Sequence, residues 1–100
     1  MADVVVLYKT PNDPAAFDKY YAETHIPLAK KMPGLRKYEV SQAPVVSAAG
    51  PSGIYLIATL TFDSVVAVQS AFGSAEATAA DVPKFATGGA DILFVDAKEV

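Results

Sequence analysis

The segment from Ile54 to Phe62 is the strongest strand pattern in the sequence, because β-branched, aliphatic and aromatic residues fill it. A strand, a helix and a strand pattern precede it, and a helix and a strand pattern follow it. This order is the ferredoxin-like βαββαβ plan, an α+β fold in which a four-stranded antiparallel sheet carries its helices on one face. Alternation divides the segment into two faces, with Ile54, Leu56, Ala58, Leu60 and Phe62 on one and Tyr55, Ile57, Thr59 and Thr61 on the other.

The other strand patterns differ in how much of each face they can bury. Val4 to Tyr8 is continuously apolar, which predicts a central strand that is buried on both faces. Leu35 to Gln42 alternates, which is typical of a half-exposed strand, and Ile92 to Ala97 forms the last strand pattern. The intervening residues 43–53 are rich in Ala, Pro, Ser and Gly, and we expect them to form a loop.

The first helix pattern begins at Asp13, which can cap free N–H groups, and continues with Pro14 at the first helical position. We expect the helix to run to about Thr24 and regular helix to end near His25, because Ile26 precedes a proline and is biased away from helical conformation. One further turn over Pro27 to Met32 stays open. Three- and four-residue steps give this helix one apolar face, made by Phe17, Tyr20 or Tyr21, Thr24 and Leu28.

The second helix pattern follows the capping pair Asp63-Ser64, and Gly73 suits the left-handed position just past its end. Ser74 can cap a third segment, residues 75–80. We expect Pro83 to break that segment, so that Phe85 packs in the turn that follows.

The composition indicates a subunit interface. A chain of 100 residues is expected to form a single domain, residues 1–100, yet 52% of its residues are hydrophobic. So small a domain has too little interior for that many apolar side chains. We therefore expect a homodimer in which two sheets pack face to face around a cavity.

Charge and residue usage exclude several classes of function. The net charge of −3 and the absence of a long basic run disfavour binding to nucleic acid or to an anionic membrane. Without cysteine there is no disulfide, no thiolate nucleophile and no zinc–thiolate site. The acidic Asp3 near the N-terminus and the lack of an apolar run of ~20 residues favour a cytoplasmic protein.

His25 is the single histidine and the first candidate for chemistry, because imidazole accepts and donates protons near neutral pH. Facing a cavity, it could remove a proton beside a carbonyl group, and Tyr38 could hydrogen-bond the developing enolate oxygen. Tyr20 and Tyr21 cannot both point inward, and Tyr21 is favoured because it stands one helical turn before His25. Two other interpretations stay open: His25 caps the end of its helix, and Tyr38 is simply a packed ring.

The remaining candidate site residues are substrate-binding ones. We expect these to be Tyr21, Phe17, Tyr55 and Thr59, in contact with a small apolar or aromatic ligand, although such residues also occur in ordinary cores and strands. No His-x-x-Glu or paired-His spacing predicts a metal, and no glycine-rich loop predicts a phosphate-bearing cofactor. We therefore expect neither a metal nor a cofactor.

Several short motifs resemble the EthD family of dimeric α/β-barrel proteins. The residues that carry the resemblance are Phe17-Asp18-Lys19-Tyr20-Tyr21, Thr24-His25-Ile26-Pro27-Leu28-Ala29, Pro33-Gly34-Leu35, Tyr38-Glu39-Val40, Phe62-Asp63-Ser64, Ala80-Asp81-Val82-Pro83 and Phe85. The resemblance implies a ferredoxin-like homodimer with a small-molecule pocket, an association with ethyl tert-butyl ether degradation and a general oxidoreductase label. In isomerase-like and dehydratase-like relatives, the histidine that matches His25 does acid–base work and Tyr38 matches a pocket tyrosine.

Three functions follow as expectations. The first is isomerase or dehydratase chemistry on an enolisable or aromatic substrate, centred on His25. The second is a cofactor-independent oxygenase of the same fold. The third is a non-enzymatic protein that binds a ligand for an oxidising partner, so the sequence leaves open whether the chain is an enzyme.

Overall fold

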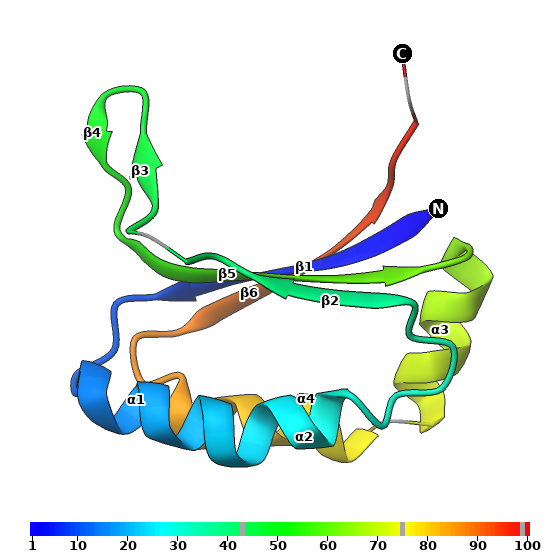
Figure 1. The fold of residues 1–100 in the computed structure, drawn as a ribbon, viewed down its shortest axis with the longest axis horizontal. Coiled ribbons are helices and arrows are strands. Elements are labelled where there is room, and N and C mark those ends of the chain that lie inside the picture. Colours follow the sequence, from blue (N-terminus) through cyan, green and yellow to red (C-terminus); the bar gives the residue numbers. More distant parts are fainter. Residues whose placement is uncertain (43, 75, 99) are drawn as a thin grey trace.

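The computed structural model describes residues 1–42, 44–74, 76–98 and 100, without the side chains of residues 74–80. Its main sheet has four antiparallel strands in the order β2-β5-β1-β6, which confirms the ferredoxin-like α+β plan (Figure 1). In the register of the sheet, Val6 lies between Ala58 and Ile92. The strands are β1 Ala2–Lys9, β2 Lys37–Val40, β5 Ile54–Phe62 and β6 Ala90–Asp96.

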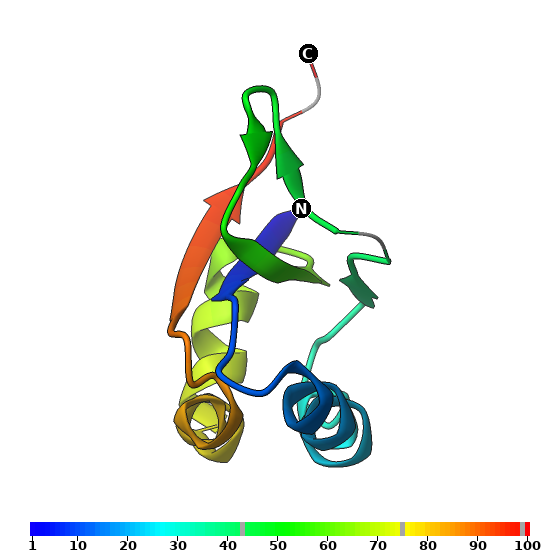
Figure 2. The ribbon, with the colours of Figure 1, turned by 90° about the vertical axis from the view of Figure 1, so that its left-hand side faces the viewer.

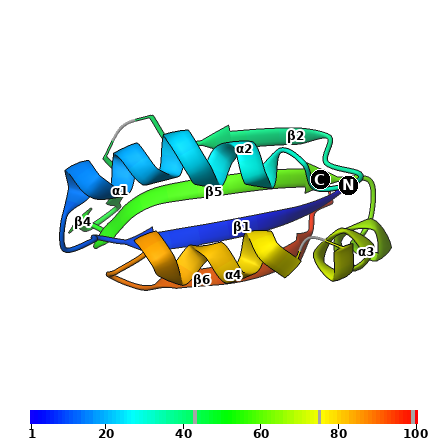
Figure 3. The same ribbon diagram turned by 90° about the horizontal axis from the view of Figure 1, so that it is seen from below.

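The helices cover one face of this sheet. Seen from below, one rod of helix and α4 lie side by side and run along the strands, with α3 at one end (Figure 3). The end-on view shows the same two rods next to each other under the sheet (Figure 2). The rod consists of α1, a π-helical turn η1 and α2. The bounds are α1 Pro14–Tyr20, η1 Tyr21–His25, α2 Ile26–Ala29, α3 Val65–Ser74 and α4 Glu76–Phe85.

The core lies between the helices and the sheet. Alternate residues of β1 point toward the helices and are buried there, whereas the residues between them are only half-buried. Phe17 of α1, Phe62 of β5 and Phe85 of α4 close the same core. Each such side chain contributes roughly 1.5–3 kcal/mol through burial, so this layer supplies much of the stabilisation.

The prediction that Val4–Tyr8 is buried on both faces was wrong in one respect. Val5 and Leu7 point away from the helices and are half-buried, since no described part of the chain packs over that side of the sheet. The register places an apolar group of side chains on this open face: Val5, Leu7, Ile57, Thr59, Leu93 and Val95.

Three local predictions were also wrong. The first helix does not stop at His25, because η1 and α2 continue it to Ala29. Gly73 lies inside α3 rather than in a left-handed turn after it. Pro83 is accommodated within α4, so Phe85 ends that helix instead of lying in a turn. Ala75, the first residue of the segment expected over 75–80, lies outside the described residues.

The predicted loop over residues 43–53 contains a short hairpin that extends from the sheet (Figure 1). Its strands are β3 Val46–Ser47 and β4 Gly50–Pro51. None of the helices in the described part of the chain is long and apolar enough to cross a membrane.

Candidate functional site

The π-helical turn sets which side chains of the first helical rod face the sheet. Phe17, Tyr21, His25 and Ala29 stand four residues apart, and all of them are buried. In a regular α-helix, four residues advance by about 400°, so Ala29 would lie about 120° around the helix from Phe17. The turn η1 holds more residues per turn than an α-helix and takes up this excess rotation. It thereby keeps His25 directed inward.

His25 is held by a carboxylate from the neighbouring helix α4. Its Nδ1 lies 3.0 Å from Oδ2 of Asp81 on α4, and both side chains are nearly completely buried. The other carboxylate oxygen, Oδ1, accepts a 2.7 Å hydrogen bond from the hydroxyl of Tyr20. If Nδ1 carries the proton and donates it to Asp81, Nε2 keeps a free lone pair. His25 then has the tautomer that a general base requires.

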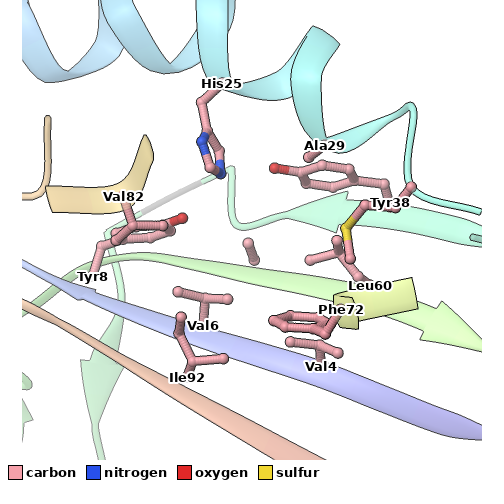
Figure 4. A pocket seen from close by; sticks show the side chains of 12 residues that line it. Val4, Val6, Tyr8, His25, Ala29, Tyr38, Leu60, Phe72, Val82 and Ile92 are labelled. Atoms are coloured by element: carbon pink, nitrogen blue, oxygen red, sulfur yellow. The ribbon is translucent and has the colours of Figure 1, made fainter. Parts of the chain in front are cut away.

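A small cavity of about 30 Å³ lies beside this pair, between the helices and the sheet. A cavity needs roughly 10–15 Å³ to hold one water molecule, so this one accepts a group of a few heavy atoms. Figure 4 shows His25 pointing into it, with the hydroxyls of Tyr8 and Tyr38 directed toward the imidazole from either side. Most of the lining is hydrocarbon, from Val4, Val6, Ala29, Met32, Ala58, Leu60, Phe72, Val82 and Ile92.

Burial sets the protonation states of the His25–Asp81 pair. It lowers the pKa of His25, and the hydrogen bond to Asp81 opposes only part of that shift, so the imidazole is neutral at pH 7. Burial alone would raise the pKa of Asp81. The hydrogen bonds from Tyr20 and His25 outweigh it and leave that pKa lowered, so the carboxylate is ionised.

The tyrosines around the cavity remain protonated. Burial raises the pKa of Tyr8, Tyr21 and Tyr38, and each hydroxyl therefore stays a hydrogen-bond donor at neutral pH. The hydroxyls of Tyr21 and Tyr38 lie 2.7 Å apart. The cavity thus combines a neutral base with neutral donors in an apolar surrounding.

The structure brings some of the predicted site residues together and separates others. His25 and Tyr38 line one cavity. Tyr21 does not line it, but its hydroxyl is hydrogen-bonded to the hydroxyl of Tyr38. The cavity lies on the helix side of the sheet within one chain, however, and not between two facing sheets as expected. Thr59 points to the open face of the sheet, because it pairs with Val5.

Phe17 and Tyr55 also lie away from the cavity. Phe17 packs in the aromatic core against Tyr8 and Tyr21. The Tyr55 ring contacts Phe17, and its hydroxyl donates a 2.7 Å hydrogen bond to Asp18 on α1.

Two residues of the site were missed. Asp81 orients His25, which also corrects the alternative that His25 caps a helix end, since the helix continues past it. Tyr8 was assigned only to a strand, yet its hydroxyl reaches the cavity. Tyr8 lies on the helix-facing side of β1, and Asp81 lies on the buried side of α4. Their positions on these faces were the signal in the sequence that could have placed them at the site. Among the described residues, no cluster of three His, Cys, Asp or Glu side chains could hold a metal ion.

The fold and site define a ferredoxin-like α+β protein with a buried His–Asp pair beside a small apolar cavity. The chain belongs to the EthD family, because the EthD domain model matches residues 9–89. It is 37% identical over 102 residues to an uncharacterised 11.0 kDa protein of the thcB–thcC intergenic region of Rhodococcus erythropolis, covering 100% of this chain and 98% of that protein. An EthD-family crystal structure from Bacillus halodurans is 32% identical, with a TM-score of 0.87 and coverage of 98% of this chain and 99% of that one.

Two more distant structures share the fold. A hydroxynitrile lyase from Passiflora edulis is 19% identical, with a TM-score of 0.73 over 99% of this chain and 94% of its own. SnoaB, a cofactor-independent oxygenase from Streptomyces nogalater that was crystallised as a mutant, is 14% identical, with a TM-score of 0.66 over 99% and 94%. At these identities the likeness concerns the fold alone.

Proposed function

We propose that this chain is a small-molecule enzyme in which His25 acts as the general base on an enolisable substrate. The observation that carries the proposal is the 3.0 Å contact between His25 Nδ1 and Asp81 beside a cavity into which the imidazole points. Asp81 is a positioning residue, because it fixes the ring and the tautomer and touches no substrate.

The reaction balances within the cavity. Nε2 of His25 removes a proton from the carbon beside a carbonyl group, and the electron pair moves to the carbonyl oxygen as an enolate. The Tyr38 hydroxyl stabilises that oxygen by hydrogen bonding. The imidazolium then returns the proton to the same carbon, to another carbon in an isomerisation, or to a leaving hydroxyl in a dehydration.

Proton exchange in D₂O tests this proposal without knowledge of the natural substrate. Simple ketones and lactones are incubated with the protein, and deuterium incorporation next to the carbonyl is followed by NMR. We expect His25→Gln and His25→Ala to reduce exchange at least about 100-fold, the usual contribution of a general base. Exchange that is equally fast in folded His25→Gln contradicts the proposal.

A cofactor-independent oxygenase is the second candidate. The same neutral base in an apolar cavity could deprotonate a phenol or quinol, and the fold likeness to SnoaB makes this test worthwhile. Oxygen uptake with quinols would support it. Absence of both exchange and oxygen uptake, with ligand binding intact, would favour a binding protein that serves an oxidising partner. An association with ether degradation would then be that of an accessory protein to the oxidising system.

We also propose that the open face of the sheet packs against a second copy. Val5, Leu7 and Ile57 form an apolar surface there, and Leu93 at the edge of the sheet is 46% exposed. Uncovered apolar surface of this kind is unusual in a monomer. Sedimentation should give a dimer at micromolar concentration, and Leu7→Lys should give a folded monomer; a monomeric wild type contradicts the proposal.

A further inference from the structure

We infer that the cavity takes a neutral ligand with one carbonyl or hydroxyl oxygen, held by Tyr8 and Tyr38, and a hydrocarbon remainder. This inference rests on the proposed function, because it names the substrate class of the same site. It is carried by two features of the cavity: the position of its polar atoms and the placement of charge.

The polar atoms of the lining gather at one end. Only three of the described side chains that line the cavity carry a nitrogen or oxygen, namely Tyr8, His25 and Tyr38. Their polar atoms converge below the helical rod, while aliphatic and aromatic groups form the floor and the far wall (Figure 4). A ligand that places one oxygen at this end leaves its remaining atoms against hydrocarbon, where a second polar group would lose its hydration without a partner.

The direction of the hydrogen bonds indicates what Tyr38 can offer a ligand. A hydroxyl carries one proton, so Tyr38 can donate to a ligand only if it does not donate to Tyr21. The hydroxyls of Tyr21 and Tyr38 lie 2.7 Å apart, and either can be the donor. When Tyr21 donates to Tyr38, the Tyr38 proton is available to a ligand oxygen.

The placement of charge disfavours ionic ligands. All eight Lys and Arg side chains are described, all are exposed, and none of them lines the cavity. Asp81 does not line the cavity either, because its carboxylate is engaged by His25 and Tyr20, and Nζ of Lys84 lies 4.0 Å from its Oδ1. A carboxylate or phosphate in the cavity would therefore meet hydroxyl groups and a neutral imidazole in place of a cation.

A matched pair of probes tests this directly. Acetone and the anion acetate have four heavy atoms each, which suits a cavity of this size. Binding is measured at pH 7.5 through the methyl NMR signals of Val4, Val6 and Ala29. We expect acetate to bind at least about 100-fold more weakly than acetone, since an unpaired buried charge costs several kcal/mol.

Tyrosine variants test the hydrogen bonds. Tyr38→Phe should weaken ketone binding about 3- to 10-fold, the equivalent of one neutral hydrogen bond. Tyr55→Phe is the matched control, because it removes a tyrosine hydroxyl outside the cavity, and it should leave binding unchanged. Equal binding of acetone and acetate, no binding of acetone, or equal effects of the two variants would each overturn the inference.

The result is separable from that of the exchange experiment. Ketone-selective binding without deuterium exchange would uphold the ligand class and refute the catalytic role of His25. Deuterium exchange in ketones, together with acetate bound as tightly as acetone, would uphold the catalytic role of His25 and refute the ligand class.

Discussion

Deleting Glu23 tests whether the π-helical turn is what directs His25 into the cavity. Glu23 is an exposed residue inside η1, and its removal leaves the inward-facing residues separated by four, three and four positions. At about 100° per residue in an α-helix, Phe17, Tyr21, His25 and Ala29 would then point in directions of about 0°, 40°, −20° and 20°. A proline inside a regular α-helix clashes with the preceding turn and costs about 3 kcal/mol, so the deletion is combined with Pro27→Ala. The double variant should convert the rod into a regular α-helix that keeps the same buried face.

The matched control deletes Lys19, which is also exposed but lies in α1 before the π-helical turn. That change turns Phe17 by about 100° relative to the rest of the rod. The expected cost is that of removing a phenylalanine from the core, about 3–5 kcal/mol, whereas deleting Glu23 together with Pro27→Ala should cost less than about 1 kcal/mol.

Urea denaturation followed by circular dichroism measures both changes, and the Nδ1 proton resonance of His25 reports whether its contact with Asp81 survives. We expect that resonance to persist after deletion of Glu23. Equal destabilisation by the two deletions, or loss of the resonance in the Glu23 deletion, would refute this account of the turn.

Three further predictions concern single side chains. Asp81→Asn should destabilise the protein by about 1–3 kcal/mol in urea denaturation, because it weakens buried charge-assisted hydrogen bonds, whereas Asp63→Asn at the surface should change stability by less than about 0.5 kcal/mol. Folding lowers the pKa of His25, so as the pH falls the unfolded chain binds the proton before the folded chain does. The free energy of unfolding of the wild type should therefore decrease below pH 6.5 by up to about 1.4 kcal/mol per pH unit. His25→Gln should lack this slope between pH 6.5 and 5, and an unchanged slope in the variant contradicts the prediction. Gly88→Ala should lower the melting temperature, since a Cβ there would collide with the carbonyl oxygen of Thr10.

Much of the fold could be predicted because its signals are local. The strand Ile54–Phe62 has the predicted bounds, and Asp13 caps the first helix by accepting a hydrogen bond from the N–H of Ala16. The errors arose where tertiary packing overrides local preference. Pro27 and Pro83 both lie within helices that the sequence was expected to interrupt, because packing on the sheet outweighs the lost hydrogen bond.

The open face of β1 illustrates a different limit. A run of valines and leucine is equally consistent with a strand buried on both faces by its own chain and with one whose second face meets another molecule. Val5 and Leu7 remain half-buried in the single chain, so the pattern reports the amount of apolar surface and not what covers it.

The catalytic candidates could be predicted only in part, since the contact between His25 and Asp81 spans 56 positions and depends on two helices lying side by side. The topology of the fold nevertheless indicates the contact between His25 and Asp81. The ferredoxin-like plan places both helices on the same face of the sheet, and Asp81 stands one helical turn before the apolar Phe85, on the face that must be buried. A buried carboxylate needs a partner. On the first helical rod, His25 continues the four-residue spacing of Phe17 and Tyr21, which directs it inward toward such a partner. Combining topology with the requirement that buried charge be paired therefore links the two residues before any coordinates are known.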